Sequence, residues 1–231
     1  MSDAREQILG DIRKSLAHAK REDPTRLEAR LKNHPAGLIP RRSSGRDRAG
    51  LVKLFEEQIT MVSATVRRVR SLADVPAAVA EYLSSQNLPA EATVATDKLL
   101  DSVDWTQHPM LRIRRGIPDP KDQVGVSAPF AAIAETGTLM LLSGPDSPST
   151  LNFLPDTHIV VLLASKVVGP MEDAWQRLRA ARNNDVVGAA MPRTVNLITG
   201  PSRTADIEQK IEMGAHGPRR QHILIVEDEP A

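Results

Sequence analysis

Short apolar runs alternate with helix-like segments over most of this chain, and this alternation restricts the fold more than any other feature. Segments with helical periodicity lie at 51–62, 75–83 and after Pro170. The strand-like runs, rich in Val, Ile, Leu and Thr, are 65–70, 92–96, 111–114, 137–142, 158–164, 194–199 and 222–227. The pattern predicts an α/β fold with an open, mostly parallel sheet and helices on both of its faces.

The N-terminal segment lacks this alternation of helix-like and strand-like runs. Asp3 and Glu6 are placed as an N-cap and its capping-box partner, which predicts a helix from Asp3 to about Lys20. Its apolar stripe is formed by Ile8, Ile12 and Leu16. Such a stripe either folds back on the domain or docks on a partner or a second copy, and we expect the latter.

Between Glu22 and Arg48 the periodicity fades, and Pro and Gly interrupt a polar, Arg-rich stretch that we expect to be a linker or extended arm. Residues 1–50 hold 12 Lys and Arg against 7 Asp and Glu, whereas the whole chain has a net charge of +1. The expected division is therefore an N-terminal helix and basic arm at 1–46, and an α/β domain at 47–231. A new helix is expected after Ser202, carrying Ile207 and Ile211.

Several function classes are not expected from the composition. The chain has no Cys, so it offers no thiolate ligand for an iron–sulfur cluster. The basic run at 41–48 lacks interleaved aromatic residues, which favours a solvated linker over nucleic-acid binding. The six His are scattered, so no metal site is expected, and no glycine-rich nucleotide motif occurs. Without an apolar leader or a run of 18 to 20 apolar residues, we expect a cytoplasmic protein that is not inserted in the membrane.

Glu135 is the first candidate site residue, in the segment AETGTLML (134–141). A carboxylate at the mouth of an apolar strand must find hydrogen-bond donors or a ligand, because burying it unpaired is costly. Gly137 would allow a turn or a close approach of a ligand. The alternative is a structural Glu135 that accepts bonds from loop amides.

The second candidate is the segment NLITGPSRTADIE (196–208), in which Ser202 would cap the expected helix. Free amides and the Arg203 guanidinium would then form a site for a carboxylate or phosphate. Alternatively, Asp206 and Glu208 hold Arg203 in an ordinary surface pair. The third candidate is His216, in a glycine-rich turn before the last strand, either as an acid or base or as a structural residue. His158, which opens an apolar strand, is expected to satisfy a strand end.

Taken together, the segments VGVSAPFAAIAETGTLML, HIVVLLASKVV, NLITGPSRTADIEQKIEMGAHGP and HILIVED resemble the LUD domain of the lactate utilization protein C family over about residues 50–228. The resemblance implies a fold similar to the sugar-phosphate isomerase and CoA-transferase group. Residue by residue, it carries the site over to Glu135 and His216 as catalytic candidates. The implied ligand-binding positions are Thr136, Gly137, Gly200, Pro201, Ser202, Arg203, Thr204, Asp206 and Gly217.

The same resemblance implies a role in oxidising L-lactate to pyruvate. The chain would be a non-redox subunit or accessory protein with no cofactor of its own, beside partner subunits that carry iron–sulfur clusters. Two other hypotheses stay open: a stand-alone acyl- or CoA-transferase-like enzyme with Glu135 as nucleophile, and a small-molecule-binding regulator without turnover. A homo-oligomer is also compatible with the sequence.

The sequence further predicts that Glu135, the Ser202–Thr204 segment and His216 converge on one pocket. The expected place is the carboxyl-terminal edge of the parallel strands, where open α/β sheets bind their ligands. A small anion, such as the carboxylate of a 2-hydroxy or 2-oxo acid, would be held there by Arg203.

Overall fold

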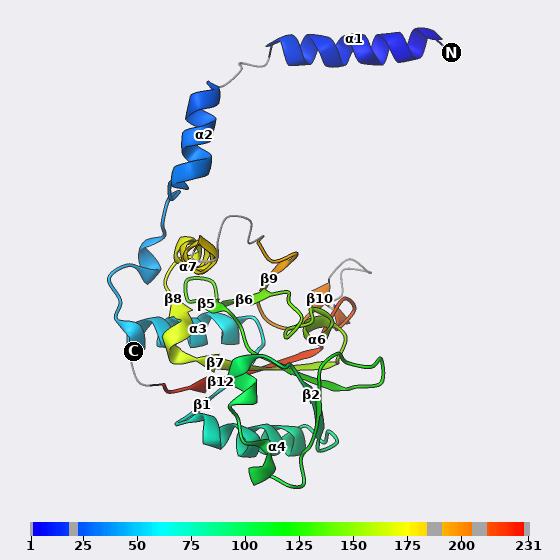
Figure 1. The fold of residues 1–231 in the computed structure, drawn as a ribbon. Helices are drawn as coiled ribbons and strands as arrows, with labels where there is room; N and C mark the ends of the chain where they lie inside the picture. Colours follow the sequence, from blue (N-terminus) through cyan, green and yellow to red (C-terminus); the bar gives the residue numbers. More distant parts are fainter. Residues whose placement is uncertain (1, 19–22, 184–190, 205–211, 229–231) are drawn as a thin grey trace. The chain divides into compact units, whose positions relative to one another are not determined.

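The computed structural model describes residues 2–18, 23–183, 191–204 and 212–228. It divides into two compact units, of which the first ends at Leu38 and the second begins at Ile39 (Figure 1). The helices are α1 (Ser2–His18), α2 (Pro24–Asn33), α3 (Arg48–Met61), α4 (Val75–Ser85), α5 (Lys98–Asp101), α6 (Thr150–Phe153) and α7 (Met171–Asn183), with short 3-10 turns η1 (Arg41–Ser43), η2 (Leu72–Asp74), η3 (Trp105–Gln107) and η4 (Ala164–Lys166).

The first unit corrects two expectations. α1 begins at Ser2, so Asp3 lies inside the helix and not at its N-cap. The stretch expected to be an irregular arm contains α2, whose N-cap Asp23 accepts a hydrogen bond from the Thr25 amide at 3.0 Å. Pro24 occupies the first helical position, where its missing N–H costs nothing. This cap followed by Pro was the signal in the sequence for the second helix.

The second unit is built on a six-stranded, wholly parallel sheet, here called the central sheet, in the order β1-β12-β7-β4-β2-β3. Its strands are β1 (Thr65–Val69), β2 (Glu91–Val94), β3 (Arg112–Arg115), β4 (Val124–Ser127), β7 (Thr157–Leu163) and β12 (Arg220–Val226). The predicted α/β class is confirmed. β12 and β7, in the middle, are almost wholly buried, which explains their uninterrupted apolar sequences.

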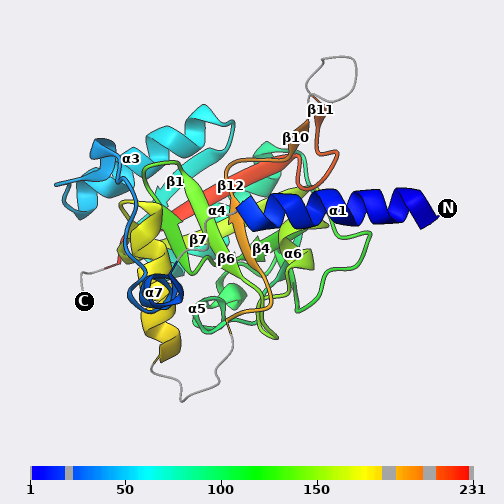
Figure 2. The same cartoon turned by 90° about the horizontal axis from the view of Figure 1, so that it is seen from above.

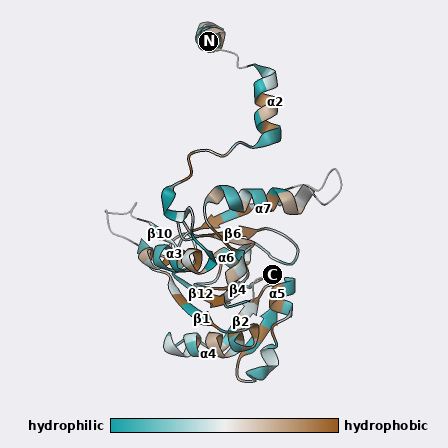
Figure 3. Cartoon of the chain, turned by 90° about the vertical axis from the view of Figure 1, so that its left-hand side faces the viewer, coloured by the Kyte–Doolittle hydropathy of each residue, from teal (hydrophilic) through white to brown (hydrophobic). Residues whose placement is uncertain are grey.

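Helix α4 covers one face of the central sheet, where Val79 and Leu83 pack on Ile159 and Leu224. The other face is covered by α3 and by a second sheet (Figures 1 and 2). This second sheet has the order β8-β5-β6-β9 and consists of β5 (Ala131–Ile133), β6 (Thr138–Leu142), β8 (Val167–Val168) and β9 (Val195–Ile198). Helix α7 packs on its outer side, and Figure 3 shows the apolar residues concentrated in the strands between these layers.

The second sheet was not expected. The sequence predicts the runs 137–142 and 194–199 as strands of one mostly parallel sheet, but β6 pairs antiparallel with both β5 and β9. The reason is burial: β6 lies between the central sheet and α7, so both of its faces are apolar and it has the sequence of a parallel core strand.

The prediction of a helix that begins after Ser202 is also wrong for its first two residues. Arg203–Thr204 form strand β10, which pairs antiparallel with β11 (Glu212–Met213). Ile207 and Ile211, on which the helical periodicity depended, lie outside the described residues.

Among the helices that the structure describes, none is long and apolar enough to cross a membrane.

Candidate functional site

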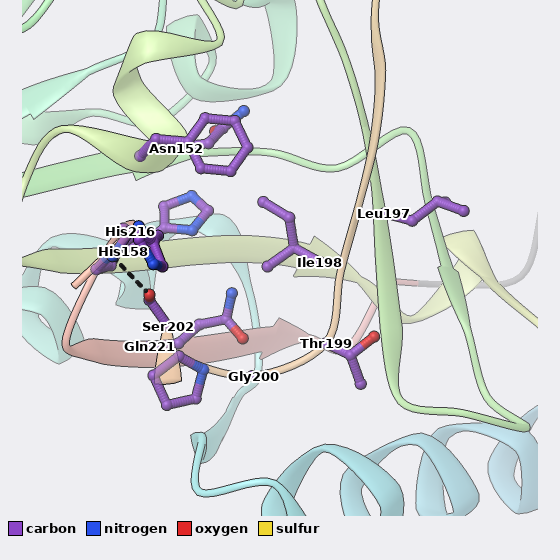
Figure 4. Close-up of a pocket in the computed structure, with 13 residues that line it drawn as sticks. Asn152, His158, Leu197, Ile198, Thr199, Gly200, Ser202, His216 and Gln221 are labelled. Atoms are coloured by element: carbon purple, nitrogen blue, oxygen red, sulfur yellow. Dashed lines mark hydrogen bonds between the residues drawn. The ribbon is translucent and has the colours of Figure 1, made fainter. Parts of the chain in front are cut away.

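A cavity of about 230 Å³ lies between the central sheet and the end of β9 (Figure 4). The lining comes from α6, the end of β9 and the starts of β7 and β12, together with the two turns that the sequence motifs form. It consists of Asn152, Phe153, His158, residues 197–202, residues 216–218 and Gln221.

The cavity lies at the amino-terminal edge of the central sheet. His158 and Gln221 are the second residues of β7 and β12 and are partners in register. The expected position at the carboxyl-terminal edge is therefore wrong for this cavity. The rule for open α/β sheets concerns loops that leave parallel strands, whereas β9, whose following turn lines the cavity, belongs to the antiparallel part of the second sheet.

The two motif turns are held together mainly by backbone hydrogen bonds around Ser202. Its amide donates to the Pro218 carbonyl at 2.8 Å, and its carbonyl accepts from the Gly214 amide at 2.8 Å. Its hydroxyl accepts a bond from the His216 amide at 3.2 Å, drawn as a dashed line in Figure 4. The structure thus brings together five of the predicted site residues, namely Gly200, Pro201, Ser202, His216 and Gly217.

Three buried polar side chains that sequence reasoning did not select complete the cavity. His158 is fully buried, its Nε2 lies 2.7 Å from the Ser127 hydroxyl, and burial lowers the pKa of its imidazole to about 4. Its Nδ1, both amide atoms of Asn152 and the Oε1 of Gln221 have no hydrogen-bond partner among the described residues. Such groups are costly to bury without partners, so their gathering at one cavity points to a ligand site.

A sequence signal for two of these residues exists. His158 and Gln221 interrupt apolar strands at positions that alternate in phase with Val160 and Ile223, which face α3 and the second sheet. A polar residue on the core side of a strand needs a partner. For Asn152 the sequence offers no comparable signal, because α6 is a single short turn in a long connection.

Glu135 does not line this cavity. Its carboxylate is buried, and Oε1 accepts a hydrogen bond from the Met171 amide at 3.1 Å, at the first residue of α7. Its backbone amide donates to the Gly169 carbonyl, and its carbonyl accepts from the Arg42 guanidinium. Oε1 is thus placed as in the structural alternative considered above, at a helix N-terminus, whereas Oε2 is buried with no hydrogen-bond partner among the described residues. A catalytic role of Glu135 stays a prediction.

The two motifs are nevertheless connected. The hydroxyls of Thr136, Thr138 and Thr199 form a chain with two distances of 2.7 Å, and Thr199 lines the cavity. Gly137 and Gly200 have φ angles of 65° and 82°, and a Cβ on either would lie within 2.6 Å of the backbone of α3 or of Val62, the residue that caps α3. Gly137 therefore permits a close approach of a helix and not of a ligand.

Arg203 is exposed and, like Thr204, is absent from the cavity lining, and Asp206 lies outside the described residues. Among the described residues, no Lys, Arg, Asp or Glu lines the cavity. Anion binding by Arg203 thus stays a prediction without support from this geometry. In the described part of the chain, no three His, Asp or Glu side chains are arranged to hold a metal ion.

Comparisons with known proteins find a domain match for the region that contains this cavity. Residues 121–226 match the model of the LUD domain. An uncharacterized protein of Neisseria meningitidis serogroup B is 40% identical over 102 residues, which are 44% of this chain and 41% of that protein. Lactate utilization protein C of Geobacillus thermodenitrificans is 38% identical over 112 residues, 48% of this chain and 45% of that protein. The matched region thus makes up less than half of each of these two relatives.

A solved structure shares the fold. The crystal structure of a DUF162 family protein from Deinococcus radiodurans superposes with a TM-score of 0.58 and 20% sequence identity, covering 78% of this chain and 99% of that one.

Proposed function

Since residues 121–226 match the model of the LUD domain, we propose that the chain serves the utilization of L-lactate as a non-redox subunit or accessory protein. The carrying observation is the match to relatives named lactate utilization protein C. The residues that match the LUD domain model, 121–226, include all those that line the cavity. Gly200, Ser202, His216 and Gly217, which the family resemblance singled out, line that cavity together.

The proposed division of labour follows from the chemistry of the side chains. Oxidation of L-lactate to pyruvate removes two electrons, and a chain with no Cys provides no thiolates to hold an iron–sulfur relay. We therefore assign electron transfer to partner subunits that carry such clusters, and ligand binding to this chain.

A growth experiment tests this proposal. The gene is deleted in a host strain without another lactate dehydrogenase, and growth on L-lactate is compared with growth on pyruvate. We expect the deletion strain to grow on pyruvate but not on L-lactate, and we expect the intact gene to restore growth on L-lactate. Normal growth of the deletion strain on L-lactate would remove the proposal. Co-purification of a tagged chain with iron-containing proteins from lactate-grown cells tests the partner assignment.

A further inference from the structure

We propose that the cavity at the amino-terminal edge of the central sheet binds an uncharged planar group whose edge carries a hydrogen-bond donor beside an acceptor, as in a carboxamide or a nucleobase. This goes beyond the role in lactate utilization, and direct binding tests it independently of growth. The inference rests on the side chains that line the cavity.

The side chain of Asn152 carries the main argument. It is 1% exposed, it lines the cavity, and neither its carbonyl oxygen nor its amino group has a partner among the described residues. A carboxamide with both atoms free matches an edge that offers one donor and one acceptor side by side, which is how Asn pairs with an adenine edge. A purely accepting group such as phosphate would leave the Asn152 oxygen unsatisfied.

Gln221 and His158 extend this neutral polar surface. The Oε1 of Gln221 is a free acceptor, and the Nδ1 of His158 is a donor or an acceptor according to which ring nitrogen holds the proton. Burial keeps the pKa of His158 near 4, so its ring is neutral at cellular pH. Because no Lys or Arg of the described residues lines the cavity, an anion here would lose its hydration without gaining a cation.

The remaining lining is apolar and suits the faces of a ring. Phe153 comes from α6, Leu197 and Ile198 come from β9, and Pro218 comes from the turn before β12. Figure 4 shows Asn152 on one side of the cavity, Gln221 and Ser202 on the other, and Ile198 beside the space between them. A planar heterocycle can thus contact apolar side chains while its edge meets the amides.

Calorimetric titration of the full chain with nicotinamide and with adenine tests the proposal, with L-lactate, pyruvate and inorganic phosphate as anionic probes. We expect at least one of the two neutral probes to bind and none of the anions to bind at this cavity. Asn152→Asp, which replaces the donor by a charge, should weaken that binding at least tenfold. Asn33→Asp in α2 makes the same change at an exposed residue outside the cavity and should leave it unaltered.

A second readout separates ligand recognition from a structural role. Asn152→Leu removes two unsatisfied polar atoms from the interior at similar volume, so the free protein should melt at a higher temperature while binding is lost. A lower melting temperature together with unchanged binding would show that Asn152 supports the fold. Failure of both neutral probes to bind, or anion binding that Asn152→Leu abolishes, would overturn the proposal. If Asn152→Asp does not fold, Gln221→Leu provides the binding comparison.

Discussion

His158 and His222 lie at neighbouring strand starts, and both imidazoles are held in the neutral form. Burial lowers the pKa of each to about 4, and for His222 the nearby Arg67 contributes to the decrease. In the unfolded chain the same groups titrate near 6.5, so between these pH values the unfolded state binds more protons. The stability from these residues is therefore complete above about pH 6.5 and is lost as the pH falls toward 4.

This difference predicts a pH-dependent stability. Between pH 7 and pH 5, the free energy of unfolding should fall by about 2 kcal/mol for each of the two imidazoles, to the extent that the other groups do not compensate. Urea denaturation at both pH values checks this. His158→Gln should reduce the decrease by about half, and a decrease that is equal in both proteins would show that His158 does not contribute.

Glu135 offers a test between its two roles. As the acceptor for the first amide of α7, it should be replaceable by Gln, which keeps an oxygen at that place. Glu135→Ala should cost about 1 kcal/mol or more, the usual effect of losing a helix cap. Thermal denaturation of both variants measures this. The nucleophile hypothesis predicts instead an acyl adduct on Glu135 after incubation with acyl-CoA. The buried carboxylate leads us to expect no such adduct in the mass spectrum.

At the scale of elements, the contact of α3 and its C-cap with the turns at Gly137 and Gly200 leaves no room for an added side chain. A Cβ at position 137 would lie 2.5 Å from the amide nitrogen of Ile59 while φ is 65°. Gly137→Ala should therefore lower the free energy of unfolding by about 2 kcal/mol or more. Gly144→Ala is the matched control, because no atom lies within 4 Å of the Cβ it would add. Equal unfolding midpoints for the two variants would contradict the close approach seen here.

The elements differ in how far the sequence could predict them. The strands of the central sheet and helices α3, α4 and α7 follow from local periodicity, since each buries one consistent face or is wholly apolar. Strands β6 and β9 were found at the expected positions, but periodicity does not specify which strand pairs with which. The direction of pairing, and with it the edge at which the cavity lies, depends on tertiary contacts.

The candidate site shows the same limit. Local motifs indicated Ser202 and His216, because turns with Gly and Pro have a recognisable sequence. Asn152 reaches the same cavity from a connection between β6 and β7, and only the packing of α6 against β4 and β7 places it there. Glu135, in contrast, was indicated by its place at the mouth of an apolar strand, but its carboxylate accepts a hydrogen bond at the start of α7 and does not line the cavity.

For the whole molecule, the boundary between the two units gives a prediction for truncated chains. The second unit begins at Ile39, and the arm residues that follow it belong to that unit's structure. Arg42 donates to the Gln58 side chain at 3.0 Å and to the Glu135 carbonyl at 3.2 Å, and Ser43 is buried. Residues 39–46 are thus integrated with α3 and with the loop before β6, although their composition resembles that of a linker.

A chain without residues 1–38 should therefore unfold at the same urea concentration as the second unit of the full chain and should bind the same ligand, because all residues that line the cavity lie in the second unit. Removing residues 1–46 should shift the midpoint to lower urea, since the bonds of Arg42 and the burial of Ser43 are lost with it. Identical midpoints for both truncated chains would place the boundary at 46/47, as the composition suggested. If removal of residues 1–38 is already enough to unfold the domain, these residues contribute to the core and the division at Leu38 is wrong.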